Sequence, residues 1–563
     1  MTTLVVPGVR VEARFDVLPP LPAPSGILGA VGIVDRPPAL GGLIGVSKVS
    51  EIRQVLGPGT EVSMPEMVNA LANGASEAVV SPVAGGKAAS VTLDNAAGAE
   101  AIILRCRSNG TWGNSLRADI STVFNAAGNP VRVSLRLMRD GRIVETFSDL
   151  QVAPGQIDDF FDVINRGSRY VVAIDSGFAN ALPDPADSPF VFAENTTVHP
   201  VQRTGGAETL FDLLPADGVS PVGLSVELAV SSGRISLKVF KAGLQEEFSG
   251  LVMNPDDENY LPYVLLTQSR YIRVRPHASL VDALPAATGG PVAFTGGESP
   301  TVQDYLAAID LLSDDPRIDL VIACIEPGRA NTEVHQIHQA LVSHCVTMTD
   351  NGAPRIAFGS VTRDEQGNIG KIKDHAAAVR NRRMVLVAPA GAEGAVAGSV
   401  GRMKPQFSPT FQPLNLHGIT ASSYRESQLN QLLGETINLL VVQNRAGRGV
   451  VVLRGIDTTG DQISVTRVAD QCIRETKAIA ENFIGRLNTE DARIALKQQL
   501  VATFMRMERD NALVPSTDGS DPAFLVDVYS TQMDFAQGIV RIDIAVRPVR
   551  AIDYIYATIR VKN

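Results

Sequence analysis

One stretch of the chain is repeated about 101 residues further along. VETFSDLQV at 144–152 aligns with QEEFSGLVM at 245–253, and a Ser-Arg-Tyr motif follows each copy at the same distance, at 168–170 and 269–271. Each copy has mostly strand patterns and one short helical stretch before this motif. Two copies are too few for a solenoid, which needs about three. We therefore expect two tandem β-rich modules, whose shared residues rebuild the same core and turns. A duplicated ligand site is the alternative.

The segments on either side of the repeat have a different texture, in which apolar strands alternate with helices. Strands are expected at 26–34, 77–83, 319–326, 355–361 and 384–390, and helices at 47–56, 64–75, 302–312, 331–348 and 369–381. Such alternation is typical of a layered α/β domain with a largely parallel sheet. The fold class expected is thus mixed α/β. Its discontinuous core comprises 26–98 and 298–445, with the β-rich insertion modules at 99–200 and 201–297.

Residues 446–563 are predicted to form a second α/β unit. A strand is expected at 450–456, followed by a helix at 465–484 with one continuous apolar stripe. A second helix is expected to open at Asn488, with Asp491 in its first turn. Two further strands are expected at 523–530 and 538–549.

Both ends of the chain alternate apolar and polar residues with the period of a strand. The arm predicted at 1–25 includes a Pro-rich linker, which begins at Leu18. The residues expected to pair with another subunit are Val5, Val9, Val11, Ala13 and Phe15 at the first end and Ile555, Ala557, Ile559 and Val561 at the other. A strand without a local partner must pair with a distant edge or with another chain. The pattern therefore favours strand exchange between copies.

Composition excludes several classes of protein. The net charge of −10 argues against a basic surface that binds nucleic acid. The sequence has no run of about 20 apolar residues, so no membrane span is predicted. The first residues lack the basic and apolar regions of a signal peptide, so synthesis in the cytosol is expected. Four dispersed cysteines are too few for a disulfide framework, and we expect them to be free and buried.

No catalytic, cofactor or metal site is expected. Gly85-Gly86-Lys87 lacks the spacing of a phosphate loop, and 391–401 lacks that of a dinucleotide loop, so close helix packing is the better interpretation of its glycines. No GxSxG nucleophile motif is present. The groups that invite a metal interpretation are His335, His338, His344, Cys324 and Cys345. They are interpreted as structural, because a zinc site would need further convergent ligands.

The chain resembles the contractile tail sheath family of myovirus tails and contractile injection systems. The resemblance lies in the order of several segments rather than in any single motif. These segments are PGVRVE (7–12), GILGAVGIV (26–34), APAGAEGAVAGSVGR (388–402), the run from Leu414 to Thr459, and RPVRAIDYIYATIRV (547–561).

This resemblance implies a structural subunit that forms stacked hexameric rings around an inner tube and contracts without a nucleotide or other cofactor. The implied partners are other copies of the chain, the inner tail tube protein, and baseplate and tail terminator proteins, with no direct nucleic acid and no membrane insertion. The location would be a virion tail, assembled in the host cytoplasm, or a cytoplasmic injection particle. Basic residues that could face the tube are Arg467, Arg474 and Lys477. A non-contractile shell or surface-layer subunit is the alternative, and an α/β enzyme is a more distant one.

Overall fold

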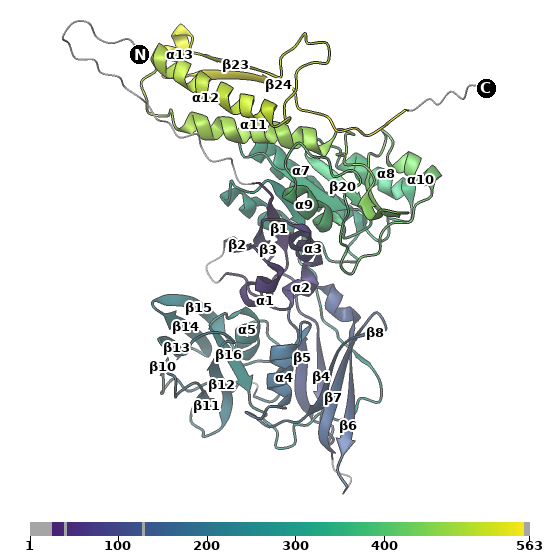
Figure 1. The fold of residues 1–563 in the computed structure, drawn as a ribbon. Coiled ribbons are helices and arrows are strands. Elements are labelled where there is room, and N and C mark those ends of the chain that lie inside the picture. The colour runs from purple at the N-terminus through teal and green to yellow at the C-terminus, as the bar shows by residue number, and fades with distance from the viewer. Residues whose placement is uncertain (1–24, 39–41, 127–129, 179, 557–563) are drawn as a thin grey trace, which may run out of the picture. The chain divides into compact units, whose positions relative to one another are not determined.

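The computed structural model describes residues 25–38, 42–126, 130–178 and 180–556 (Figure 1). These residues divide into two compact units, which are described separately. One comprises 464–552, and the other comprises 25–463 together with 553–556.

The larger unit is built on an eight-stranded sheet in the order β2-β3-β1-β18-β19-β20-β21-β22. Its strands are β1 (Ile27–Gly32), β2 (Ile44–Val46), β3 (Glu77–Pro82), β18 (Leu320–Ala323), β19 (Ile356–Ser360), β20 (Met384–Ala388), β21 (Leu440–Arg445) and β22 (Gly449–Val452). The six central strands run parallel, and β2 and β22 are antiparallel edges. The expected α/β class with a largely parallel sheet is confirmed. The sheet takes strands from both sides of the repeat, and it includes β22, which we expected to open the C-terminal unit.

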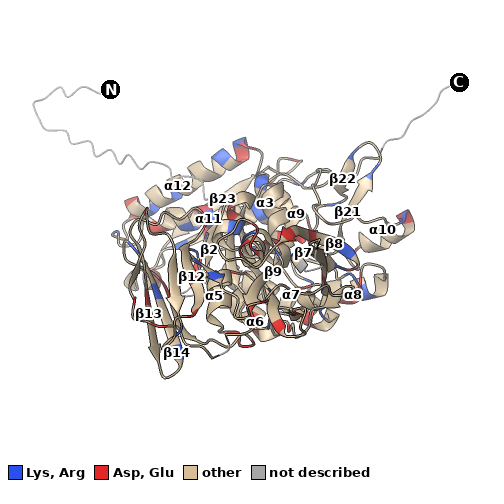
Figure 2. Ribbon diagram, turned by 90° about the horizontal axis from the view of Figure 1, so that it is seen from below, with Lys and Arg blue, Asp and Glu red and all other residues tan. Residues whose placement is uncertain are grey.

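Helices cover both faces of this sheet, as Figure 2 shows for α3 and α9 on one side and α6, α7 and α8 on the other. The first face also holds α1, and the second also holds α10. Their bounds are α1 (Ile52–Val55), α3 (Pro65–Asn73), α9 (Glu393–Arg402), α6 (Val302–Leu311), α7 (Asn331–Asp350), α8 (Ile369–Ala378) and α10 (Glu426–Leu432), and a short α2 (Thr60–Ser63) precedes α3. Along β1, Leu28 and Ala30 join the first core while Ile27 and Val31 join the second. Burial on both faces explains why these strands are continuously apolar.

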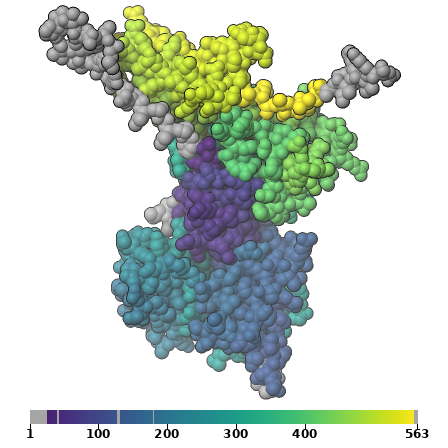
Figure 3. All heavy atoms as spheres, in the orientation of Figure 1, coloured from purple at the N-terminus to yellow at the C-terminus, as the bar shows by residue number. Residues whose placement is uncertain are grey.

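The two copies of the repeat have the same order of elements. The first contains β4 (Ser90–Asp94), β5 (Glu100–Cys106), β6 (Leu116–Phe124), β7 (Pro130–Arg139), β8 (Arg142–Leu150), α4 (Phe160–Gly167) and β9 (Val171–Asp175). The second contains β11 (His199–Gln202), β12 (Thr209–Pro215), β13 (Leu224–Ser231), β14 (Arg234–Lys241), β15 (Leu244–Leu251), α5 (Leu261–Gln268) and β16 (Ile272–Pro276). In each copy the first, second and last strands form one sheet, which is β4-β5-β9 in the first copy and β11-β12-β16 in the second. The three middle strands form a second, antiparallel sheet, and the single helix precedes the last strand. The copies lie side by side (Figures 1 and 3) and share one hydrophobic cluster.

Each copy also receives an edge strand from the segment that follows the other copy. The short β10 (Phe190–Val191) comes after the first copy and pairs with β13 of the second. The short β17 (Val292–Ala293) comes after the second copy and pairs with β6 of the first. An ion pair at 2.6 Å joins Arg273 of the second copy to Asp162 of the first. The two copies are thus interlocked rather than strung in a row.

The recurring serine of the Ser-Arg-Tyr motif fixes the same turn in both copies. The Ser168 hydroxyl donates to Glu145 at 2.6 Å, and the Ser269 hydroxyl donates to Glu246 at 2.6 Å. In both copies the N–H of the following residue donates to the second oxygen of that carboxylate. The repeat is therefore explained by a shared structural contact, as expected.

The smaller unit packs two long helices against a two-stranded sheet. Its elements are α11 (Ile463–Glu481), α12 (Glu490–Arg509), β23 (Phe524–Tyr529), α13 (Gln532–Ala536) and β24 (Arg541–Val546). The predicted start of α12 at Asn488 is wrong by one residue. The cap is Thr489, whose hydroxyl accepts from the N–H of Ala492 at 3.2 Å, whereas the Asn488 amide donates to Ser530.

Candidate functional site

The sheet of the smaller unit has only two strands among the described residues, so both of its outer edges are unpaired there. The strands β23 and β24 are antiparallel, with Val526 opposite Ile544. One face packs on α12, where the Phe524 ring lies 5.6 Å from that of Phe504. A two-stranded sheet is only marginally stable by itself, and a free edge offers a row of N–H and C=O groups to another strand. This edge pair is the strongest candidate for an assembly site.

Large apolar side chains are exposed on the smaller unit. Leu525 on β23 is 61% exposed, and Met533 and Phe535 on α13 are 74% and 59% exposed. Beyond the end of α11, Ile484 and Leu487 are both 82% exposed. Exposed apolar groups gathered on one small unit mark an interaction surface.

Most of the residues predicted to form strand arms lie outside the described residues: Val5, Val9, Val11, Ala13, Phe15, Ala557, Ile559 and Val561. Ile555 is described, is 84% exposed, and lies in the segment 551–556, where no strand forms. Just before it, Asp553 accepts from Arg454 at 3.3 Å, and the Arg454 guanidinium lies 5.5 Å from the centre of the Tyr554 ring. The segment is thus held at Asp553 and presents Ile555 to solvent.

The three basic residues suggested for tube contact differ in exposure. Arg467 is buried, Arg474 is half-buried and Lys477 is exposed. Of the three side chains, that of Lys477 is the most exposed.

The histidines and cysteines do not gather as one group. His344 accepts from buried Arg355 at 2.6 Å, and burial together with this guanidinium lowers the pKa of His344 to about 4. His335 and His338 instead meet His375 and Glu365, which the sequence analysis did not single out. All four cysteines are free and buried, as expected.

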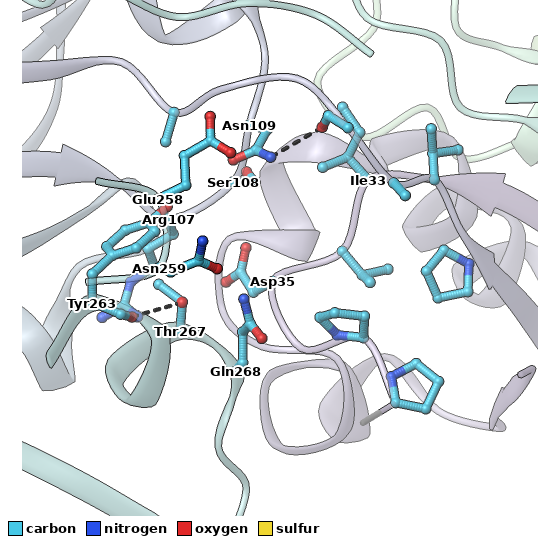
Figure 4. Close-up of a pocket in the computed structure, with 18 of the residues that line it drawn as sticks. Ile33, Asp35, Arg107, Ser108, Asn109, Glu258, Asn259, Tyr263, Thr267 and Gln268 are labelled. Carbon is cyan, nitrogen blue, oxygen red and sulfur yellow. Dashed lines mark hydrogen bonds between the residues drawn. The ribbon is translucent and has the colours of Figure 1, made fainter. Parts of the chain in front are cut away.

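A cavity of about 410 Å³ lies where the first strand of the core approaches the repeat (Figure 4). Asp35 accepts from the N–H of Gly59 at 2.5 Å, and burial raises the pKa of Asp35 to about 6 despite the nearby Arg107. The Arg107 guanidinium donates to the carbonyl of Ser168 at 2.8 Å. These charged groups thus join the core to the first copy of the repeat.

The glycine-rich helix α9 packs against α3 at very short range, which confirms the interpretation of 391–401. A Cβ added at Gly394 would lie 1.9 Å from the carbonyl oxygen of Glu66, and one at Gly398 would lie 2.1 Å from that of Ala70. Only glycine permits this approach of two backbones.

Two carboxyl groups are buried at this helix contact. Burial and the neighbouring Glu393 raise the pKa of Glu66, and burial raises the pKa of Glu393. The Oε2 atom of each is buried and accepts no hydrogen bond from any described residue. The folded protein therefore favours the protonated forms.

This arrangement predicts that the free energy of unfolding falls as the pH rises above 4.5, the ordinary pKa of glutamate. Above that pH the folded state holds protons that the unfolded state releases, at a cost of up to about 1.4 kcal/mol per pH unit for each group. We expect Glu393→Gln to raise the Tm at pH 8 and to change it little at pH 5, measured by thermal unfolding. Glu426→Gln, at an exposed position on α10, is the matched control. An equal shift at both pH values would contradict the buried, protonated state.

Comparison with known proteins bears on the C-terminal part of the chain. Residues 457–562 match the family model described as the phage tail sheath C-terminal domain. This segment is thus similar to the C-terminal domain of phage tail sheath proteins. The predicted resemblance to sheath proteins is thereby confirmed where the two-stranded sheet and its free edges lie. No curated protein matches the sequence.

Solved structures similar to this chain include sheath proteins. The sheath tail protein of Desulfitobacterium hafniense is 14% identical, with 99% of this chain and 100% of that one covered and a TM-score of 0.46. A sheath tail protein of Listeria innocua is 10% identical, with 94% and 93% covered and a TM-score of 0.45. The helical sheath of the anti-feeding prophage in its contracted state is 17% identical, with 48% and 78% covered and a TM-score of 0.36.

The segment that matches the sheath model thus contains a small unit that has exposed apolar groups and a sheet whose outer edges are unpaired among the described residues. None of the described helices is both long and apolar enough to cross a membrane.

Proposed function

We propose that this chain is the structural subunit of a contractile tail sheath, either of a phage tail or of an injection system. The observation that carries the proposal is the two-stranded sheet β23–β24, with both outer edges unpaired among the described residues, inside the segment that matches a sheath domain. The N-terminal strand of one neighbour and the C-terminal strand of another would extend it to four strands.

In this proposal six subunits form a ring, and the rings stack around an inner tube. Each exchanged strand contributes roughly 1 kcal/mol per backbone hydrogen bond, so a whole strand makes a durable link. The links persist while the bodies rotate and move outward, and new contacts between bodies in the contracted state supply the work. No step requires a nucleotide. Lys477 is the residue we propose for contact with the tube, since of the three basic residues it alone lies at an exposed position.

The interlocked modules are proposed to lie on the outer surface, where insertions are tolerated. Their role there is bulk and contact with neighbouring subunits. The ends of the sheath would meet the baseplate and terminator proteins.

Negative-stain imaging of the purified, concentrated protein tests the proposal. Hollow tubes or stacked six-fold rings are the expected result. Flat sheets or closed shells would favour the non-contractile alternative, and monomers at high concentration would contradict assembly by strand exchange.

A further inference from the structure

A cluster of metal-ligand type joins α7, the loop after β19, and α8. His335 Nε2 lies 2.7 Å from Glu365 Oε1, and His375 Nδ1 lies 2.8 Å from Glu365 Oε2. One ligand atom from each of the three residues falls within 4.8 Å of the others. The two imidazole rings lie 4.1 Å apart, centre to centre, so both face the same carboxylate.

The groups around the cluster hold these ligands in place. His338 Nδ1 lies 2.9 Å from His375 Nε2, and the N–H of Thr362 donates to Glu365 at 2.8 Å. These two contacts hold the ring of His375 and the carboxylate of Glu365 in position.

We propose that His335, Glu365 and His375 bind a divalent transition metal ion of the zinc class. Imidazole nitrogen and carboxylate oxygen are donors that suit such ions. The metal would take the place of the two hydrogen bonds that now join the imidazoles to Glu365, and the N–H proton of each ring would move to its other nitrogen. The Nε2–H of His375 would then donate to His338, the supporting contact that metal-bound histidines usually have.

Access and space are compatible with such an ion. The side chains of Glu365 and His375 are 1% and 0% exposed, whereas that of His335 is 19% exposed and opens the cluster to solvent. Tetrahedral metal–ligand bonds of about 2.0–2.2 Å require each nitrogen and oxygen atom, now 2.7 and 2.8 Å apart, to separate by roughly 0.5–0.9 Å. Water from the solvent side of His335 would complete the coordination.

The site is independent of the proposed function, since it lies in the core sheet unit and uses no sheet edge. Its role would be structural: the metal would join α7, α8 and the loop between them at one point.

The test is a titration of the full chain with Zn²⁺ after stripping with a chelator, followed by calorimetry and elemental analysis. One Zn²⁺ per chain is expected for the wild type. His335→Gln, whose amide can still donate to Glu365, is expected to weaken binding about 100-fold or more, and His338→Gln about 10–100-fold. His417→Gln is the control: the backbone N–H and carbonyl of His417 bond with the Asn69 side chain, outside the cluster, and this variant is expected to bind Zn²⁺ as the wild type does.

Two further measurements distinguish loss of the metal site from loss of folding. The Tm of His335→Gln in chelator should match that of the wild type, and added Zn²⁺ should raise only the wild-type value. Co²⁺ bound to the wild type should show a visible spectrum of nitrogen and oxygen ligands without a thiolate band. Absence of stoichiometric Zn²⁺ in the wild type, or unchanged affinity in His335→Gln, would overturn the proposal.

Discussion

Deletion of residues 1–20 is expected to leave a folded subunit that no longer forms tubes. The deleted segment carries the alternating strand pattern but none of the described core. Its loss would remove one strand from every junction between subunits, at roughly 1 kcal/mol for each backbone hydrogen bond. Circular dichroism and thermal unfolding would show retained folding, and negative-stain imaging would show the loss of tubes.

A matched pair of variants tests whether assembly depends on the apolar face of the predicted strand or only on the presence of the N-terminal segment. Replacing Val9, Val11 and Phe15 by Asp places charge on the face expected to be buried in the neighbour's sheet, and should abolish tubes. Replacing Arg10, Glu12 and Arg14 by Ala changes the opposite face and should leave tubes in place. Tubes that persist after the deletion would show that the arm has no part in assembly.

The second large effect is expected at the contact of α3 with α9. Gly398→Ala would place a Cβ 2.1 Å from the carbonyl oxygen of Ala70, so the two backbones must separate. Overpacking typically lowers the free energy of unfolding by about 1–3 kcal/mol. Because the added Cβ would meet the backbone of α3 rather than a flexible side chain, we expect a loss at the upper end of this range. The higher helix propensity of alanine would offset only about 1 kcal/mol of this loss. Gly398→Leu should prevent folding of the larger unit.

The measurement is the Tm of the larger unit, with Gly367→Ala as the control. Gly367 is exposed, and a Cβ added there meets no atom within 4 Å. A Tm that is unchanged or raised in Gly398→Ala would contradict the close approach of the two helices.

The sequence predicted the α/β core because its strands are buried on both faces and are therefore continuously apolar. The repeat was evident because the same turn is fixed by the same pair, Ser168 with Glu145 and Ser269 with Glu246. The glycines of α9 pointed to close packing because their spacing places them on one helix face.

Other features have no local signal in the sequence. The strands β10 and β17 are two residues long, too short for periodicity to reveal. Glu365 and His375 reach His335 only because successive parallel strands place α7, the loop after β19 and α8 beside one another. The start of α12 was misplaced because Asn488 and Thr489 are both good caps, and only the contact with Ser530 assigns Asn488 elsewhere.

The reciprocal placement of β10 and β17 bears on how such an insertion can change over evolutionary time. Each copy pairs with an edge strand from the segment that follows the other copy. Removing one copy together with that segment would leave a sheet edge of the remaining copy unpaired. A relative carrying a single copy would need a new covering strand before the loss became tolerable. We therefore expect the two copies to be inherited or lost as a pair.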